Sequence, residues 1–371
     1  MKIIKYILLA IALLNVPTFS LEYISPSLGA LTSMLLLAGS LLYFFISKKS
    51  KPAFPFIILG LCFFSFAGLN YSGITDEFFK DVIRFFIFII CFNQVSKDTT
   101  DKELLIFLLI GALSITVNAL FFSNVFGRYS GFYINPNKAG FICLFGFAVS
   151  YIINSYKLRL VIQFAFIICG IFTLSRSFIL MLVLINLASL FADKRNIQTF
   201  VVGSAAMIVI LTASTLQLNK ERFSALNSIF SSNEEVDTQT ITEGSRDETW
   251  AMYSNVIFNN AVIGAGYKAM RGDSGLAGVE YGVHNTFLMV LGEAGILAFL
   301  LIVIIYLALF VRSLKSFSTN QEFTYLSMAL IGYLMVAHNY FDKYDVLFVS
   351  LWLYNKVRDQ HKEDVSQILA Y

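Results

Sequence analysis

Residues 284–312 read HNTFLMVLGEAGILAFLLIVIIYLALFVR, and this stretch decides the fold class. Between His284 and Arg312 the only charged residue is Glu293. A helix needs roughly 20 mainly apolar residues to cross about 30 Å of hydrocarbon, and this run exceeds that length. The stretch therefore predicts a membrane-spanning helix that begins at His284.

The rest of the chain continues this pattern. Of its 371 residues, 57% are hydrophobic and 14% are charged, whereas soluble domains carry roughly 25% charged residues. We therefore predict an all-α polytopic membrane protein with about 12 transmembrane helices. The predicted helices are residues 3–20, 28–46, 53–69, 79–96, 103–122, 139–156, 158–174, 177–192, 197–215, 284–312, 323–340 and 344–357.

Basic residues predict the orientation, because Lys and Arg concentrate in short cytoplasmic loops. One set of alternate helix ends holds 16 of the 27 basic residues, and the short loops of the other set hold 6. We therefore expect both termini in the cytoplasm and one large outer loop with short helices. The expected divisions are 1–215 with nine helices, the loop 216–283, and 284–371 with three helices and a cytoplasmic tail.

Two of the predicted spans are irregular. The first, at residues 3–20, ends in Thr18-Phe19-Ser20, which is similar to a signal-cleavage site, but we expect an uncleaved helix because further spans follow at once. The apolar stretch 158–192 is interrupted at Arg176 and is too long for one span. We expect a helical hairpin that turns at Arg176 on the outer side.

The composition also excludes several functions. A net charge of +3 is too small to indicate a nucleic-acid partner, and all four cysteines lie inside apolar runs. No Walker loop, HExxH, GxSxG or DxD pattern is present, so no cofactor or metal site is expected.

Polar residues nevertheless gather in the expected outer loops. Arg128 lies in GRYSG, ahead of NPNK at 135–138, and Arg176 lies at the hairpin tip. A charge at mid-bilayer costs about 2.5–3.5 kcal/mol, so Arg176 should face a polar cavity or, alternatively, reach the lipid headgroups.

A second polar group lies in the large loop. Its acidic stretch 231–243 could bind a cation or simply be solvated. Ser245 to Glu248 fits a capping box that opens a helix, on which Trp250 begins an apolar stripe suited to the membrane surface or to packing on the bundle. A basic residue in the first turn opposes the helix dipole, so Arg246 suggests an anionic partner, with an ordinary surface arginine as the alternative.

The helix that begins at His284 completes the set of candidates. His284 can act as a base near neutral pH, or it can simply be a polar helix start. Asn285 follows it, and Glu293 lies on the opposite face of the helix, where Arg84 is one candidate partner. Three arginines and one histidine on the same side suit a diphosphate attached to a lipid, since arginine grips phosphate oxygens in charge-assisted hydrogen bonds.

These landmarks, in this order, resemble the O-antigen polymerase and O-antigen ligase superfamily of bacterial envelope enzymes. The matching stretches lie at 127–140, 173–184, 244–270 and 284–301, and the last two are the more specific. The resemblance implies metal-independent glycosyl transfer from a polyprenyl (undecaprenyl) diphosphate-linked glycan at the outer face of the inner membrane. It implies His284 as the catalytic residue and Arg176, Arg246 and, less directly, Arg128 as diphosphate ligands.

The resemblance leaves the acceptor open. We favour a polymerase of O-antigen or capsular repeat units, with a ligase to lipid A core or to protein as the alternative. A flippase for lipid-linked glycans and an envelope scaffold are alternatives of other classes. Membrane lipids, a chain-length regulator and a flippase of the same pathway are the expected partners, and Asn285, Glu293 and Trp250 are expected to support the site.

Overall fold

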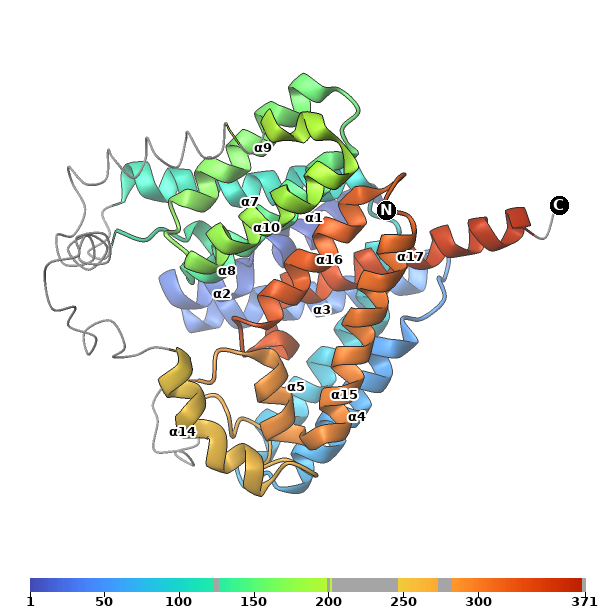
Figure 1. The fold of residues 1–371 in the computed structure, drawn as a ribbon. Coiled ribbons are helices and arrows are strands. Elements are labelled where there is room, and N and C mark those ends of the chain that lie inside the picture. Colours follow the sequence, from blue (N-terminus) through green and yellow to red (C-terminus); the bar gives the residue numbers. More distant parts are fainter. Residues whose placement is uncertain (123–126, 199–200, 202–245, 273–281, 369–371) are drawn as a thin grey trace, which may run out of the picture.

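The structure is a computed structural model that describes residues 1–122, 127–198, 201, 246–272 and 282–368. Every regular element in these residues is helical (Figure 1). The main helices are α1 (Lys2–Leu13), α2 (Val16–Tyr23), α3 (Pro26–Ile46), α4 (Phe54–Leu69), α5 (Thr75–Ile87), α6 (Asn93–Lys97), α7 (Asp101–Phe121), α8 (Pro136–Val149), α9 (Tyr156–Ile171), α10 (Arg176–Ala192), α14 (Arg246–Asn259), α15 (Thr286–Lys315), α16 (Gln321–Leu334) and α17 (Tyr344–Ile368). The all-α prediction is confirmed.

Short turns join some of these helices. A π-helical turn, η1 (Phe88–Phe92), connects α5 to α6, and the 3₁₀ turns are η2 (Gly131–Tyr133), η3 (Ser150–Ile152), η4 (Lys194–Asn196) and η5 (Tyr340–Asp342). The predicted span 79–96 is therefore a continuous helical rod with a π-helical segment in it.

The described residues contain fewer helices that are long and apolar enough to cross a membrane than the number predicted. Within the described residues, α3, α7 and α15 are long and apolar enough to cross a membrane, and α1 with α2 makes a fourth candidate if the bent pair counts as one span. The figure of about 12 is not confirmed, because α4 and α10 are apolar but only 16 and 17 residues long. Most of the predicted span 197–215 lies outside the described residues, and the division into 1–215, 216–283 and 284–371 stays a prediction.

The predicted helix 3–20 is wrong in one respect, since α1 and α2 are bent by 55°. The break lies at Asn15, whose φ of 53° is left-handed. Pro17 explains the break, because proline has no amide hydrogen to donate inside a helix but fits a first turn. Pro17 occupies the first turn of α2.

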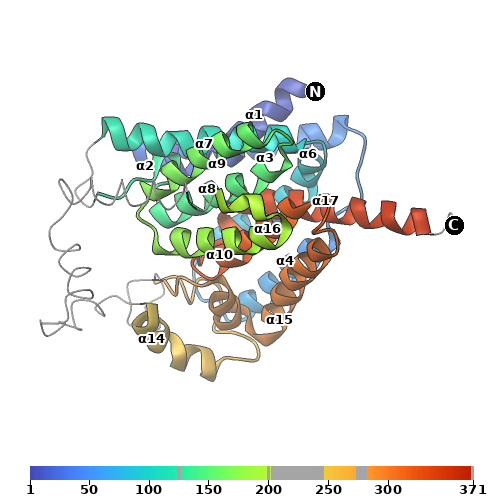
Figure 2. The same cartoon turned by 45° about the horizontal axis from the view of Figure 1, so that its top comes forward.

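Helix α8 lies at the centre of the bundle, in contact with α7, α9, α10 and α16 (Figures 1 and 2). Every residue from Lys138 to Val149 is buried. A helix that is apolar all round is suited to such a position. Its first turn carries Lys138, so a charged side chain begins the most buried helix of the molecule.

Helix α15 is interrupted at Gly295, where φ is 78° and ψ is −174°. The segment after α14 fills the break: Ala265 N donates to Gly292 O at 2.7 Å, and Ile296 N donates to Ala261 O at 2.8 Å. A Cβ on Gly295 would lie 2.1 Å from Val262 O, and one on Gly264 would lie 2.3 Å from Glu293 O. Both glycines are thus required by close backbone approach, and the turn at Gly264 is the part of the chain that packs against α15.

Candidate functional site

His284 lies two residues before the start of α15. Asn285 is the N-cap, and its side-chain oxygen accepts hydrogen bonds from Phe287 N at 2.9 Å and Leu288 N at 3.2 Å. His284 itself has a left-handed φ of 48°, a conformation that costs about 1–3 kcal/mol in a non-glycine residue. The surrounding contacts must hold this backbone in place.

Two side chains hold the flanking backbone. Trp250 of α14 donates its indole N–H to Val283 O at 2.9 Å, and Thr286 donates its hydroxyl to Ala337 O at 2.7 Å. The first contact ties His284 to α14, and the second ties it to the segment after α16. Asn285 and Trp250, expected as supporting residues, therefore contact the backbone on either side of His284.

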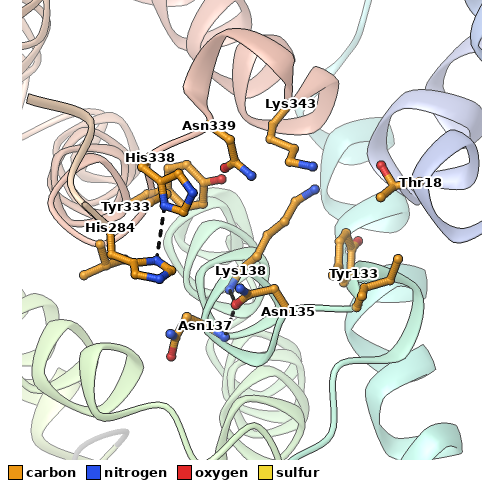
Figure 3. A pocket seen from close by; sticks show the side chains of 13 residues that line it. Thr18, Tyr133, Asn135, Asn137, Lys138, His284, Tyr333, His338, Asn339 and Lys343 are labelled. Atoms are coloured by element: carbon orange, nitrogen blue, oxygen red, sulfur yellow. Dashed lines mark hydrogen bonds between the residues drawn. The ribbon is translucent and has the colours of Figure 1, made fainter. Parts of the chain in front are cut away.

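The residue that meets the His284 ring is His338, from the loop between α16 and η5. The two Nδ1 atoms are 3.2 Å apart, and the rings form an edge-to-face pair with centroids 4.5 Å apart (Figure 3). Burial is the main cause that lowers the pKa of His338 to about 4; positive charge on His284, Arg271 and Lys343 acts in the same direction, and Asp342 opposes it. His338 is therefore neutral at physiological pH.

The two histidines line a cavity of about 130 Å³ (Figure 3). The wall comes from α2, from the segment around the start of α8, and from the chain between α16 and α17. Its residues are Thr18, Tyr133, Ile134, Asn135, Asn137, Lys138, His284, Tyr333, Val336, Ala337, His338, Asn339 and Lys343. The lining contains two lysines, two histidines and three asparagines, and no carboxylate.

One carboxylate stands behind this wall. Lys138 Nζ lies 2.9 Å from Asp345 Oδ2, and both side chains are buried. Lys138 also donates to Asn15 Oδ1 at 3.0 Å. The ammonium groups of Lys138 and Lys343 point toward one another (Figure 3). Since like charges repel, an anion between or above them would stabilise the arrangement.

Arg128 and Arg176 lie next to this wall. Arg128 donates to Asn137 Oδ1 at 3.0 Å and to Thr173 O at 3.2 Å, and Ser175 donates its hydroxyl to the same Asn137 oxygen at 3.0 Å. Ser175 is the N-cap of α10, and Arg176 is the exposed first residue of that helix. The predicted hairpin break at Arg176 is thus confirmed, and Asn137 connects both arginine-bearing segments to the cavity wall.

Arg246 is the first residue of α14, as predicted, but its side chain lies outside the described residues. The apolar stripe of α14 packs on the bundle, since Tyr253 and Ile257 belong to the buried core. Ser245 and the acidic stretch 231–243 also lie outside the described residues.

Glu293 has a different partner from the one proposed. Its carboxylate accepts hydrogen bonds from Arg271 Nε at 3.2 Å and Nη2 at 3.4 Å, whereas Arg84 bonds to Asp81 at 3.2 Å. The prediction that Arg84 is the partner of Glu293 is wrong. Arg271 follows the turn that packs against α15, and this position places its guanidinium beside the Glu293 carboxylate. Arg271 also pairs with Asp342 of η5, which anchors the far end of the loop that carries His338.

Backbone strain gathers around the cavity. The non-glycine residues with positive φ among those described are Asn15, Ile134, Leu174, Lys268 and His284. Asn15 bonds to Lys138, Ile134 lines the cavity, and Leu174 precedes the N-cap of α10. Four of the five therefore adjoin the site, and strained backbone is concentrated at functional sites in proteins.

The cavity therefore combines a histidine whose backbone and ring are both held, a second histidine that stays neutral, and a surplus of cationic side chains. His338, Lys138, Lys343 and Asp345 were not among the expected site residues. Within the described part of the chain, no group of three or more His, Cys, Asp or Glu side chains could hold a metal ion.

Comparison with known proteins identifies one region. Residues 160–303 match the family model described as O-Antigen ligase. This range includes α10 with Arg176, the helix α14 and His284. No curated protein matches the chain.

Proposed function

We propose, from its place in the O-antigen ligase and polymerase superfamily, that this membrane protein transfers a glycan from a polyprenyl diphosphate to an acceptor hydroxyl at the outer face of a bacterial inner membrane. The observation that carries the proposal is the cavity at His284, which combines a histidine with a surplus of cationic side chains. Such a site can accept a proton from a hydroxyl and hold a dianionic leaving group.

The diphosphate would bind to the cationic groups at and beside the cavity. Lys138 and Lys343 line the cavity, and Arg128 is linked to it through Asn137. Arg176 is exposed at the start of α10, where a free guanidinium fork can grip phosphate oxygens. The proposed role of Arg246 as a diphosphate ligand rests only on its sequence motif and on the family match.

The reaction follows from these roles. His284 accepts the proton of the acceptor hydroxyl as that oxygen attacks the anomeric carbon of the donor. The new glycosidic bond forms while the bond from the anomeric carbon to the diphosphate oxygen breaks, and the electron pair leaves with the lipid diphosphate. The lysines and arginines stabilise the charge that develops on the leaving group, so they act in the transition state. No step requires a metal or cofactor.

Among the possible acceptors, we propose a second lipid-linked glycan, so that the enzyme polymerises repeat units. A ligase that transfers to lipid A core or to protein is the second candidate, because the matched family model is described as O-Antigen ligase. In either case the chain-length regulator and the flippase of the pathway would work with it. A flippase role is a third candidate, which the match of residues 160–303 to a family model described as O-Antigen ligase does not favour.

Deletion of the gene, followed by electrophoresis of the surface glycans, tests the proposal. A ladder lost with a single repeat still attached to lipid A core indicates a polymerase. Long chains left on the carrier lipid indicate a ligase. Intact polymerising activity with repeat units trapped inside would overturn the proposal in favour of a flippase.

The same strain tests His284. We expect that His284→Ala, expressed at the normal level in the membrane, fails to restore the glycan, since general acid–base catalysis contributes about 100- to 10,000-fold. Arg84→Gln is the matched control, because Arg84 bonds to Asp81 away from the cavity lining. Normal glycan from His284→Ala would remove the catalytic role.

A further inference from the structure

The ring of His284 has one nitrogen committed to another side chain. Its Nδ1 lies 3.2 Å from Nδ1 of His338, a residue 54 positions further along the chain. Between two neutral imidazoles such a contact needs one N–H donor and one lone-pair acceptor. The direction of this bond decides which nitrogen of His284 can act as a base.

The His338 ring is held as firmly as its partner. Thr286 bonds to Ala337 O, directly before His338, and Arg271 holds Asp342 on the other side. A Cβ on Gly282 would lie 2.5 Å from His338 Nε2, so the chain passes directly over that edge of the ring. The Nδ1 edge is thereby fixed toward His284.

The charges around His338 favour its neutral form. Arg271 and Lys343 are the positive groups that act on it, a proton on His284 would act in the same direction, and Asp342 is the negative group. Burial acts in the same direction as the positive groups. A neutral His338 keeps a lone pair on one ring nitrogen throughout the neutral pH range.

We propose that His338 is a positioning residue whose Nδ1 accepts the Nδ1–H of His284, so that the lone pair of His284 lies on Nε2. This inference rests on the proposed function, in which His284 takes the proton of the acceptor hydroxyl. The proton then moves to Nε2, and the resulting imidazolium keeps its Nδ1–H bond to His338. The arrangement has the logic of a Ser-His-Asp triad, in which a third group fixes the tautomer of the base, but here that group is neutral.

A neutral acceptor has a specific consequence. A carboxylate in the same place would stabilise the imidazolium form of His284, whereas His338 orients the ring without adding charge. The site can thus hold a basic imidazole beside cationic phosphate ligands, with no extra carboxylate to compete for them.

Three variants of the full-length protein in proteoliposomes test the proposal. The probe is the lipid-linked repeat unit extracted from the deletion strain. His338→Asn can place an amide oxygen near the Nδ1 position and should retain most of kcat. His338→Leu keeps bulk but has no acceptor and should lower kcat about tenfold, the loss expected for one neutral hydrogen bond. His338→Asp should move the acid limb of the pH–rate profile upward by about one pH unit.

The relative kcat values of these variants distinguish a positioning role of His338 from a packing role. Equal kcat for the Asn and Leu variants, or a higher value for Leu, would overturn the proposal. If the Leu variant fails to fold, as judged by gel filtration, the pH profile of the Asp variant decides, and an unmoved acid limb overturns it. Should His284→Ala keep full activity, the proposed function fails instead, whereas an inactive His284→Ala with indifferent His338 variants refutes only the positioning role.

Discussion

Two buried lysines, Lys5 and Lys138, have nearly the same exposure but differ in the charged groups around them. Their side chains are 9% and 7% exposed, and each pairs with a carboxylate, at 2.8 and 2.9 Å. Lys5 Nζ reaches both oxygens of Glu103 and also Asp98 O, while the Asp98 side chain accepts from Tyr43 at 2.9 Å. The Lys5 network thus pairs one lysine with one carboxylate, Glu103, and with one backbone carbonyl.

At Lys138 the positively charged and basic side chains outnumber the single carboxylate. One carboxylate, Asp345, stands beside two lysines and two histidines of the cavity. The difference separates a charge that joins two helices from charges that, in the proposed function, bind the diphosphate. The Lys5 network ties α1 to α7 and needs nothing more, whereas the cavity would gain from an added anion.

The largest expected effect comes from removing the charge of Lys138. Lys138→Met leaves Asp345, which is fully buried, without its ion-pair partner. Breaking a buried pair on one side costs about 3–5 kcal/mol, so the melting temperature in detergent should fall sharply. Adding Asp345→Asn should recover most of the loss, and a single variant as stable as the wild type would contradict this account of the pair.

The burial of His338 beside positively charged groups also predicts a pH dependence of stability. His338 has an ordinary pKa of 6.5 when unfolded and a folded pKa of about 4. Between these values the unfolded chain binds a proton that the folded protein does not, so stability falls as pH decreases below 6.5. Above 6.5 this contribution is absent. At pH 5 the loss is about 2 kcal/mol.

Melting temperatures measured at pH 7 and pH 5 check the sign and the size of this effect. His338→Asn should reduce the difference between the two temperatures. If the melting temperature of His338→Asn fell between pH 7 and pH 5 as much as that of the wild type, another group would cause the acid sensitivity.

A smaller loss is expected at the Lys5 network. Lys5→Gln gives up the charge that bonds Glu103, but Glu103 still caps α7 through Thr100. We expect about 1–2 kcal/mol of destabilisation, the cost of an unsatisfied polar group, with unchanged glycan transfer per folded molecule. If Lys5→Gln lowered the transfer rate at normal stability, Lys5 would not have a purely structural role, and the distinction from Lys138 would be wrong.

The smallest effect is expected at Lys343, which lines the cavity. Lys343→Gln should leave the melting temperature unchanged and raise KM for the lipid-linked glycan about fivefold, equivalent to roughly 1 kcal/mol. Lys268→Gln is a matched surface control, since Lys268 pairs with Glu77 away from the cavity. Equal effects from both lysines would show that Lys343 acts only through net charge.

The helices were largely predictable because apolar runs and their breaks are local features. The predicted span 177–192 lies within α10 at Arg176–Ala192, for example. The break at Asn15 had a local signal too, in Pro17, which the prediction passed over. The number of spans stays a prediction, because several helices in the described residues are shorter than the roughly 20 residues that a span needs.

The site was predicted only in part. His284 and Arg128 lie in recognisable local motifs, but the pairing of His284 with His338 joins residues 54 positions apart, and no local pattern encodes such a contact. The sequence did contain a signal for Lys138 and Lys343, in the distribution of its basic residues. Together with Lys80, Arg84, Arg128 and Arg176 they are the six basic residues expected in short outer loops, where lysine and arginine are otherwise scarce. Four of these six lie at or beside the cavity.

The break in α15 at Gly295 has a consequence for protein engineering. Because Ala261 and Ala265 complete the hydrogen bonds of the broken helix, residues 246–270 and 284–300 form one exchangeable cassette. A chimera that takes α14 and its turn from a relative must take the facing part of α15 as well. An incoming segment that lacks Gly264 or Gly295 would bring a side chain into a space that only glycine fits. The two sides of the large loop are therefore joined at a backbone contact that tolerates no side chain at either glycine.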